Sequence, residues 1–259
     1  MHPTEPAQGA EPASAPTSTA IVTGAGRGFG RGTATALCRA GIRVVGIARD
    51  RTDLEKVQAE LGDSFVPVVA DATDPAVAER LLVQYAPRIL VLNAGAVPLA
   101  RPVHEYTWET FSLHWQVDVQ HVFHWTRLAL TLPLPPGSTV LAVSSGAALR
   151  GSPVSGGYAG AKAAIRFLAA YADEEAQRGG LGLRFLSVLP PLTPGSRVGD
   201  AGVAGYAARS GVKEADFIQR LGPTLTPDAV GRTVADLALD PALTGSSYQL
   251  TASGPVALD

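Results

Sequence analysis

The chain has 259 residues, a formal net charge of −2 and a single cysteine. A chain of this length can bury a sizeable core, and its weak charge excludes an electrostatic surface for nucleic acid or an anionic membrane. One cysteine excludes an internal disulfide framework, and we expect Cys38 to be a small buried apolar side chain in the first helix.

The first 17 residues differ in composition from the rest of the chain. They are rich in proline and alanine, carry two glutamates and have no apolar core of the kind found in a signal peptide. No later apolar run is long enough to span a bilayer. We therefore expect residues 1–17 to be a disordered tail, residues 18–259 to form one domain, and the protein to be cytoplasmic, with no membrane or nucleic-acid partner.

From about residue 18, apolar runs alternate with helical patterns. The predicted strands, in chain order, are 19–22, 43–47, 65–69, 88–92, 139–143, 183–188 and 248–251. The predicted helices are 31–40, 52–61, 75–85, 107–132 and 158–177. Strands that alternate with helices predict parallel pairing. The expected fold is therefore α/β: a single doubly wound Rossmann-type domain, with a parallel sheet of about seven strands and helices on both faces.

A glycine-rich turn, Thr23 to Gly30, lies between the first predicted strand and the first predicted helix. Gly24 permits the tight turn, Gly28 lets the backbone approach a pyrophosphate, and Gly30 lets the helix and strand pack closely. The N-terminus of the helix then presents free N–H groups to the phosphates. In this context the turn predicts a dinucleotide site rather than an ordinary connection.

The residues after the second strand bear on the choice of dinucleotide. An acidic side chain there would bind the ribose 2′-hydroxyl of NAD, but the chain has Ala48 and Arg49. Arg27, inside the glycine turn, could join Arg49 in a charge-assisted clamp on a 2′-phosphate. The alternative is that both arginines are solvated surface residues, and that the negative charge of Asp50 offsets the positive charge of either one. We predict NADP(H).

Tyr158 and Lys162 are four residues apart at the start of a predicted helix, so they lie on one face. Ser145 precedes Tyr158 by 13 residues, at the end of the fifth predicted strand, and Ser144 is its less favoured neighbour. A phenol, an ammonium and a hydroxyl can together move a proton onto or off a carbonyl oxygen. An exposed Tyr–Lys pair without chemistry is the alternative for these two residues alone.

These motifs, with Asn93-Ala-Gly95 after the fourth strand, resemble the classical short-chain dehydrogenase/reductase family in its NADP-preferring subgroup. The resemblance covers nearly the whole chain after residue 18. It implies that Tyr158 is the general acid in reduction, that Lys162 assists the phenol and holds the nicotinamide ribose, and that Ser145 binds the carbonyl oxygen. The residues that the resemblance places on the cofactor are Gly24, Gly26, Arg27, Gly28, Phe29, Gly30, Arg49, Asp71, Ala72, Asn93, Ala94, Gly95, Tyr158, Lys162 and Pro190.

Two residues depart from the family's pattern. Asp118 stands where the family usually has asparagine, and Pro191 follows Pro190 where the family usually has glycine. Pro191 has no N–H to offer the nicotinamide amide. An ionised Asp118 would stabilise Lys162 as a cation while offsetting part of the pull of that cation on Tyr158. We expect the ionised form, and we count Asp118 among the catalytic residues.

Histidines and tryptophans gather around the predicted fourth helix. No Cys or Glu completes a ligand set, so we predict no metal and interpret the cluster as mostly contact surface, with His104 as a candidate pocket residue. The resemblance places a subunit interface on this helix and on the Tyr158 helix, so we expect a homodimer or homotetramer. The cluster comprises His104, His114, His121, His124, Trp108, Trp115 and Trp125.

The segment 192–225 is rich in Gly, Pro and Ala, and the resemblance makes it the substrate loop. A mobile apolar lid there indicates a hydrophobic ketone or secondary alcohol, while its arginines are interpreted as solvated rather than as carboxylate ligands. The expected function is an NADPH-dependent carbonyl reductase or secondary alcohol dehydrogenase. The alternatives are a non-catalytic NADP(H)-binding sensor or scaffold, and a cofactor-assisted isomerase or dehydratase.

Overall fold

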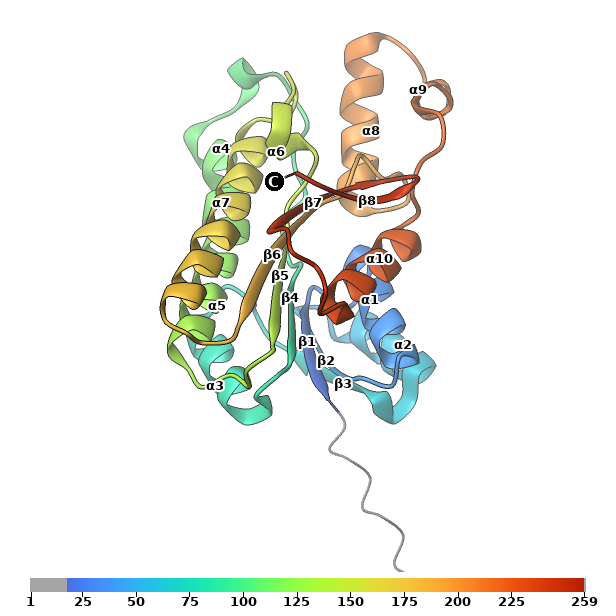
Figure 1. Cartoon of the computed structure of the whole chain (residues 1–259). Helices are drawn as coiled ribbons and strands as arrows, with labels where there is room; N and C mark the ends of the chain where they lie inside the picture. The colour runs from blue at the N-terminus through green and yellow to red at the C-terminus, as the bar shows by residue number, and fades with distance from the viewer. Residues whose placement is uncertain (1–17, 259) are drawn as a thin grey trace, which may run out of the picture.

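A computed structural model describes residues 18–258, which form one eight-stranded sheet with helices on both faces (Figure 1). The strand order is β3-β2-β1-β4-β5-β6-β7-β8, and every neighbouring pair is parallel except β7 and β8. The strands are β1 Thr19–Thr23, β2 Arg43–Ala48, β3 Phe65–Val69, β4 Ile89–Leu92, β5 Thr139–Val143, β6 Arg184–Leu189, β7 Ser247–Thr251 and β8 Gly254–Ala257.

The helices form two layers around this sheet. Helices α1, α2 and α10 cover one face, and α3, α5 and α7 cover the other (Figure 1). The long helices are α1 Gly28–Arg39, α2 Arg51–Leu61, α3 Pro75–Tyr85, α4 Trp108–His114, α5 Gln120–Thr131, α7 Gly157–Arg178, α8 Arg197–Ser210, α9 Glu214–Leu221 and α10 Pro227–Leu239. The short ones are α6 Ala147–Arg150, η1 Gly62–Ser64 and η2 Val103–Glu105, and the π segment is η3 Trp115–Val119.

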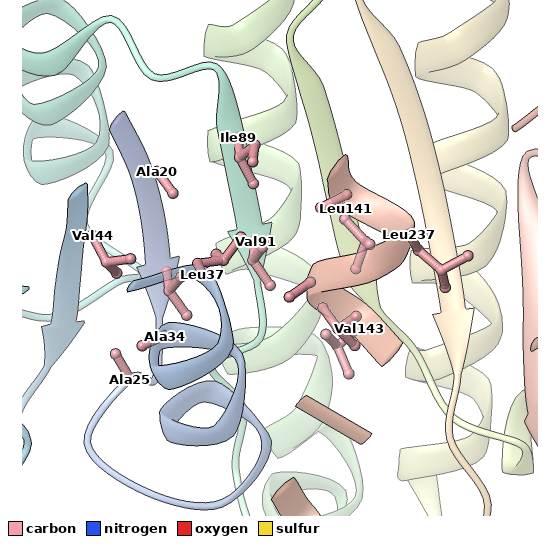
Figure 2. Packing of buried hydrophobic residues seen from close by; sticks show 14 of the residues in the cluster. Ala20, Ala25, Ala34, Leu37, Val44, Ile89, Val91, Leu141, Val143 and Leu237 are labelled. Atoms are coloured by element: carbon pink, nitrogen blue, oxygen red, sulfur yellow. The ribbon is translucent and has the colours of Figure 1, made fainter. Parts of the chain in front are cut away.

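The core explains why the strands are continuous apolar runs. In β1, Ala20 and Val22 pack in the core under α1 and α10, whereas Ile21 packs in the core under α3, α5 and α7. Both faces of a parallel sheet are covered, so each face needs apolar side chains. Figure 2 shows the first of these cores, where Leu37 of α1 and Leu237 of α10 lie among the buried strand residues.

The sheet agrees with the predicted fold class, and several element bounds agree residue for residue. Strands β3 and β5 have the predicted bounds, and α3 spans the predicted 75–85. The side chain of Asp74 accepts a hydrogen bond from the Ala76 N–H at 2.8 Å, and Pro75 occupies the first turn. An Asp N-cap followed by proline is therefore sufficient to position this helix start.

Three predictions about the elements need correction. The sheet has eight strands rather than about seven, because the chain turns after Thr251 and returns as the short antiparallel strand β8. The predicted helix 107–132 is interrupted by η3, where a wider π turn separates α4 from α5. The predicted tail, residues 1–17, lies outside the described residues and is not among these three corrections.

The third correction concerns the segment 192–225, which contains α8 and α9 rather than only loop. The Ser196 side chain accepts from the Gly199 N–H at 3.0 Å, which caps α8, and Gly211 ends the helix in the left-handed conformation. Alanine favours helix and offsets the glycines within α8. Helix α10, which follows, is also absent from the predicted elements. Within residues 18–258, no helix is long and apolar enough to cross a membrane.

Candidate functional site

The predicted site residues share one edge of the sheet. The glycine turn follows β1, Arg49 follows β2, Asp71 follows β3, Asn93 follows β4 and Ser145 follows β5. These are the carboxyl ends of parallel strands, and the strand order reverses between β1 and β4. Open α/β sheets bind ligands at this edge and at this switch point. The fold therefore brings together residues that are far apart in the sequence.

The glycine turn is tied directly to the segment after β4. The Thr23 Oγ1 atom accepts from the backbone N–H of Asn93 at 2.9 Å and of Ala94 at 3.1 Å. The Asn93 Nδ2 atom donates to the Thr23 carbonyl at 3.0 Å. A Cβ atom at Gly30 would lie 2.2 Å from the Gly24 carbonyl oxygen, so only glycine fits there. This packing fixes the turn against the switch point.

The same turn leaves space where a dinucleotide would be held. Gly28 begins α1 with a φ of 54°, and a Cβ atom added there would meet nothing within 4 Å. The open side of a helix N-terminus carries unpaired N–H groups that suit a pyrophosphate. Gly24 also has a positive φ, of 68°. The residues present therefore fit a dinucleotide at this turn.

Charged groups flank the position expected for an adenosine ribose. Arg27 and Arg49 are both exposed, and Arg27 Nη1 lies 3.5 Å from Asp53 Oδ2. Asp71 Oδ1 accepts from the N–H and the hydroxyl of Thr73, both at 2.9 Å. The backbone hydrogen bond from Thr73 is the main cause of a lowered Asp71 pKa, and the Arg49 charge lowers it further. Asp71 is therefore an anion held in place locally.

Lys162 and Tyr158 lie on the first turns of α7. Lys162 is buried, and its Nζ atom donates to the Val143 carbonyl at 3.2 Å. The same Nζ atom lies 5.6 Å from the centre of the half-buried Tyr158 ring. A Cβ atom at Gly157 would lie 1.9 Å from the Phe111 carbonyl oxygen, so glycine is required for α7 to begin against α4. The ammonium is thus held close to the phenol.

The two serines after β5 have different partners. Ser144 is buried, and its hydroxyl donates to the Lys162 carbonyl at 2.7 Å, within the backbone of α7. Ser145 is half-buried, and its Oγ atom accepts from the Ala147 N–H at 3.2 Å. The Ser145 hydroxyl proton therefore stays available for another acceptor. The preference for Ser145 over Ser144 as the catalytic serine stays a prediction, and Ser145 is the one of the two whose hydroxyl proton is not used within α7.

Asp118 lies in the π segment and is 1% exposed through its side chain. Its Oδ1 atom accepts from the Ala96 N–H at 2.8 Å, and its Oδ2 atom lies 3.2 Å from Lys162 Nζ. A Cβ atom at Gly95 would lie 2.9 Å from Oδ2, so the glycine makes room for the carboxylate. π turns of this kind occur often at functional sites. The expected Asp118–Lys162 pair is present in the structure.

Asp118 and Lys162 shift one another's pKa towards the charged forms. Burial raises the pKa of Asp118, but the Lys162 charge, with smaller effects from His114 and the Ala96 N–H, lowers it overall to about 2. Burial lowers the pKa of Lys162, and the Asp118 carboxylate reverses this, so that the pKa lies above its usual value. The two directions agree with one another. The expected ionised form of Asp118 follows from this pairing.

The prolines after β6 use their carbonyl groups locally. The Pro190 carbonyl accepts from the Gly146 N–H at 2.8 Å, which ties the end of β6 to the segment carrying Ser145. The Pro191 carbonyl accepts from the Thr193 hydroxyl at 2.9 Å. Proline in place of the family's glycine is therefore accommodated without a positive φ at either residue.

The cluster of histidines and tryptophans is divided between the surface and the interior. His104, Trp108 and Trp115 are exposed, whereas His114, His121 and Trp125 are buried and His124 is half-buried. The contact-surface interpretation therefore needs correction for the three buried members. Sequence reasoning missed His114 as a neighbour of the site, although its spacing of four residues from Asp118 is a usable signal. Within residues 18–258, no group of three or more His, Cys, Asp and Glu side chains is arranged to hold a metal ion.

Two surface cavities lie near these elements. One, of about 520 Å³, lies beside the start of α7 and is lined by Pro102, Val103, His104, Ser152, Pro153, Gly156 and Arg209. The other is an open groove of about 660 Å³ between η3, α5 and α7, lined mainly by apolar and aromatic side chains, including Trp115, Phe123, Phe167 and Tyr171. The first contains His104, as predicted for a pocket residue, and also Arg209 from α8.

The short chain dehydrogenase family model matches residues 18–200. The chain belongs to this family. Human L-xylulose reductase is 37% identical over 108 residues, which are 42% of this chain and 44% of that protein. D-erythrulose reductase of Gallus gallus is 31% identical over 151 residues, which are 58% and 61% of the two chains. Carbonyl reductase (NADPH) 2 of Sus scrofa is 36% identical over 124 residues, 47% of this chain and 50% of that protein.

The chain spans about half the length of these curated relatives, from 44% to 61%. Solved structures cover more of it at lower identity. NAD⁺-bound xylitol dehydrogenase superposes with a TM-score of 0.78 at 21% identity, over 90% of this chain and 97% of that one. The 3-ketoacyl-(acyl-carrier-protein) reductase of Brucella melitensis, complexed with NADH, has a TM-score of 0.74 at 24% identity, over 90% and 96%. These structures show the shared Rossmann-type fold of the family.

Proposed function

We propose that the protein is an NADPH-dependent carbonyl reductase that also oxidises the corresponding secondary alcohol. The observation that carries this proposal is the position of the Lys162 ammonium. It lies 5.6 Å from the centre of the Tyr158 ring and is held by the Val143 carbonyl. A buried cation is therefore fixed next to a half-buried phenol, which faces the carboxyl edge of the sheet from the start of α7. This arrangement suits a proton donor to a carbonyl oxygen.

In reduction, Tyr158 donates its phenolic proton to the carbonyl oxygen, and Ser145 donates a hydrogen bond to the same oxygen as charge develops on it. Lys162 stabilises the phenolate that results. In oxidation the phenolate of Tyr158 accepts the hydroxyl proton of the alcohol. The bound nicotinamide supplies or accepts the hydride. Asp118 holds Lys162 in position, which is the part we assign to it in place of the family's asparagine.

We propose NADP(H) as the cofactor because both cationic side chains near the glycine turn are exposed. Arg27 and Arg49 could each pair with a 2′-phosphate, and Ala48 offers no carboxylate to a 2′-hydroxyl. The Asp53 carboxylate, 3.5 Å from Arg27, partly offsets this positive charge. A relative named carbonyl reductase (NADPH) 2 is consistent with the proposal.

The substrate is proposed to be a small ketone or secondary alcohol. The cavity beside the start of α7 has apolar walls at Pro102, Val103 and Pro153, which suit the predicted hydrophobic substrate. It also has polar groups at His104 and Arg209. Relatives are named for the reduction of xylulose and erythrulose, which favours hydroxylated ketones as a second class. A substrate panel has to contain both classes.

A homodimer or homotetramer is proposed from the groove on α5 and α7. Phe123, Phe167 and Tyr171 are 44%, 54% and 58% exposed, and they lie together in this groove. Apolar patches of this kind on a monomer mark interfaces, and equal copies usually close with cyclic or dihedral symmetry. Trp115, which is 44% exposed, extends the patch towards η3.

The test is a panel of hydrophobic ketones, keto-sugars and aliphatic aldehydes, with NADPH oxidation followed by absorbance. Turnover of any member supports the reductase. NADPH binding without turnover of any member, in either direction, would support the sensor or scaffold instead. Conversion of a substrate without net NADPH consumption would support the isomerase or dehydratase.

A further inference from the structure

His114, the last residue of α4, contacts two members of the proposed proton-transfer set. Its Nδ1 atom lies 3.5 Å from Asp118 Oδ2, and its ring packs edge-on against the Tyr158 ring, with centres 5.1 Å apart and planes at 77°. Only 5% of the His114 side chain is exposed. The imidazole thus contacts both the carboxylate and the phenol ring.

The polar surroundings of this imidazole point to a specific role. His114 Nδ1 is buried and has no hydrogen-bond partner within residues 18–258, and the same is true of Asp118 Oδ2, which lies 3.5 Å away. Among the described residues, Asp118 Oδ2 forms ion-pair contacts with the Lys162 ammonium at 3.2 Å and with His114 Nδ1 at 3.5 Å. A buried imidazole without a polar partner is costly. Its contact with Oδ2 is therefore the polar interaction that justifies a histidine here.

We propose that His114 is a positioning residue: it holds the Asp118 carboxylate against Lys162 and packs against the Tyr158 ring. This inference rests on the proposed reductase function. Two anchors fix the carboxylate besides Lys162, the Ala96 N–H on Oδ1 and His114 on Oδ2. These two contacts keep the Asp118 carboxylate at its distance of 3.2 Å from the Lys162 ammonium. Lys162 in turn stays directed towards the phenol.

The structure makes a matched set of variants available. His114→Leu removes both ring nitrogens while keeping bulk, and His114→Gln keeps an N–H donor near Asp118. Ser112→Ala is the control, because Ser112 is buried on the same helix and bonds to Glu109 and Gln116 rather than to Asp118. Melting temperatures and NADPH affinities establish that each variant is folded and loaded.

We expect His114→Leu to lower kcat about 10-fold, the effect of losing one partner of a buried charged group, with less than a 2-fold change in KM for NADPH. His114→Gln should recover most of this loss. Ser112→Ala should stay within about 2-fold of the wild type, because it leaves Asp118 untouched. A loss of kcat that Gln does not restore would overturn the proposal.

A double-mutant cycle separates action through Asp118 from simple packing. If His114 acts through Asp118, then His114→Leu should cost less than about 2-fold when Asp118 is already asparagine. The same 10-fold loss in both backgrounds would contradict the proposal. If wild-type protein reduces no carbonyl, the proposed function fails instead, so the two failures are distinguishable.

The pH profile of alcohol oxidation gives a second readout that packing alone would not change. The ionisable groups around Asp118 are His114 on α4, Lys162 and Tyr158 on α7, and His121 on α5. Without His114, the Asp118 carboxylate would lie farther from Lys162 and would offset less of its positive charge. The uncompensated charge then stabilises the phenolate of Tyr158 more strongly. His114→Leu should therefore move the alkaline limb of kcat/KM to lower pH. An unmoved limb together with lowered kcat would identify a merely structural role.

Discussion

Acid stability should depend on His121, which is fully buried on α5. Burial lowers the pKa of this imidazole to about 4, against an ordinary value of 6.5, although the Asp118 charge partly opposes the effect. Both ring nitrogens lack hydrogen-bond partners among residues 18–258. The folded protein therefore resists protonating His121, whereas the unfolded chain takes up the proton freely. Protonation of the unfolded chain then favours unfolding as the pH falls.

The magnitude follows from these two values by linkage. Between pH 7 and pH 4 the unfolded chain binds more protons at His121 than the folded chain does. The free energy of unfolding therefore decreases as the pH is lowered. The 6.5-to-4 difference corresponds to a loss of about 3 kcal/mol by pH 4, of which about 2 kcal/mol is lost by pH 5. The contribution of Asp118 is lost mainly between its ordinary pKa of 3.8 and its folded pKa of about 2, which is below this window.

The assay is urea denaturation at a series of pH values from 7 to 4, with His121→Gln compared with the wild type. The variant cannot take up a proton at this position, so its stability should fall by about 3 kcal/mol less over the range. His104→Gln, at an exposed position, serves as the control and should keep the wild-type slope. Parallel curves for His121→Gln and wild type would refute the reasoning, whatever the absolute stabilities are.

Three further predictions concern the cofactor, the ion pair and the apolar groove. Replacing both Arg27 and Arg49 by alanine should weaken NADPH binding by roughly 2–4 kcal/mol and leave NADH binding little changed. Equal affinities of the unmodified protein for NADPH and NADH, measured by calorimetry, would contradict this. Asp118→Asn should retain activity and move the alkaline limb of the alcohol-oxidation profile to lower pH, because a negative charge near the phenol is lost; kcat/KM measured against pH checks this. Replacing Phe167 and Tyr171 with glutamate should convert an oligomer to a monomer by light scattering, and a monomeric wild type at micromolar concentration would remove the premise.

Much of the fold could be predicted because its signals are local. The centre of β1, Ala20 to Val22, is apolar at every position because both faces of the sheet are covered. Asp74 with Pro75 specifies the start of α3 through a side-chain cap. The glycine turn could be predicted because Gly30 tolerates no Cβ atom. Each of these signals can be identified in consecutive residues, even where the contacts that explain it are distant in the chain.

Other features depend on contacts that the sequence pattern does not carry. The π segment arises where Asp118 is drawn to Lys162 and the Ala96 N–H, both far away in the chain. The burial of His114 depends on how α4 packs against α7, so its residue type alone suggested contact surface. The sequence pattern did not predict helix α8 because its glycines disfavour a helix. The tail at 1–17, the location in the cytoplasm and the oligomeric state stay predictions.

The proposed function requires Tyr158 to transfer the proton in an NADPH-dependent carbonyl reduction. The most direct measurement is a single-turnover experiment with enzyme preloaded with NADPH and mixed with a ketone identified by the panel, for wild type and Tyr158→Phe. Tyr85→Phe, on α3, is the matched control. We expect unchanged NADPH affinity and a hydride transfer at least about 100-fold slower in Tyr158→Phe, but not in Tyr85→Phe. Hydride transfer at the wild-type rate in Tyr158→Phe, with NADPH bound, would contradict it.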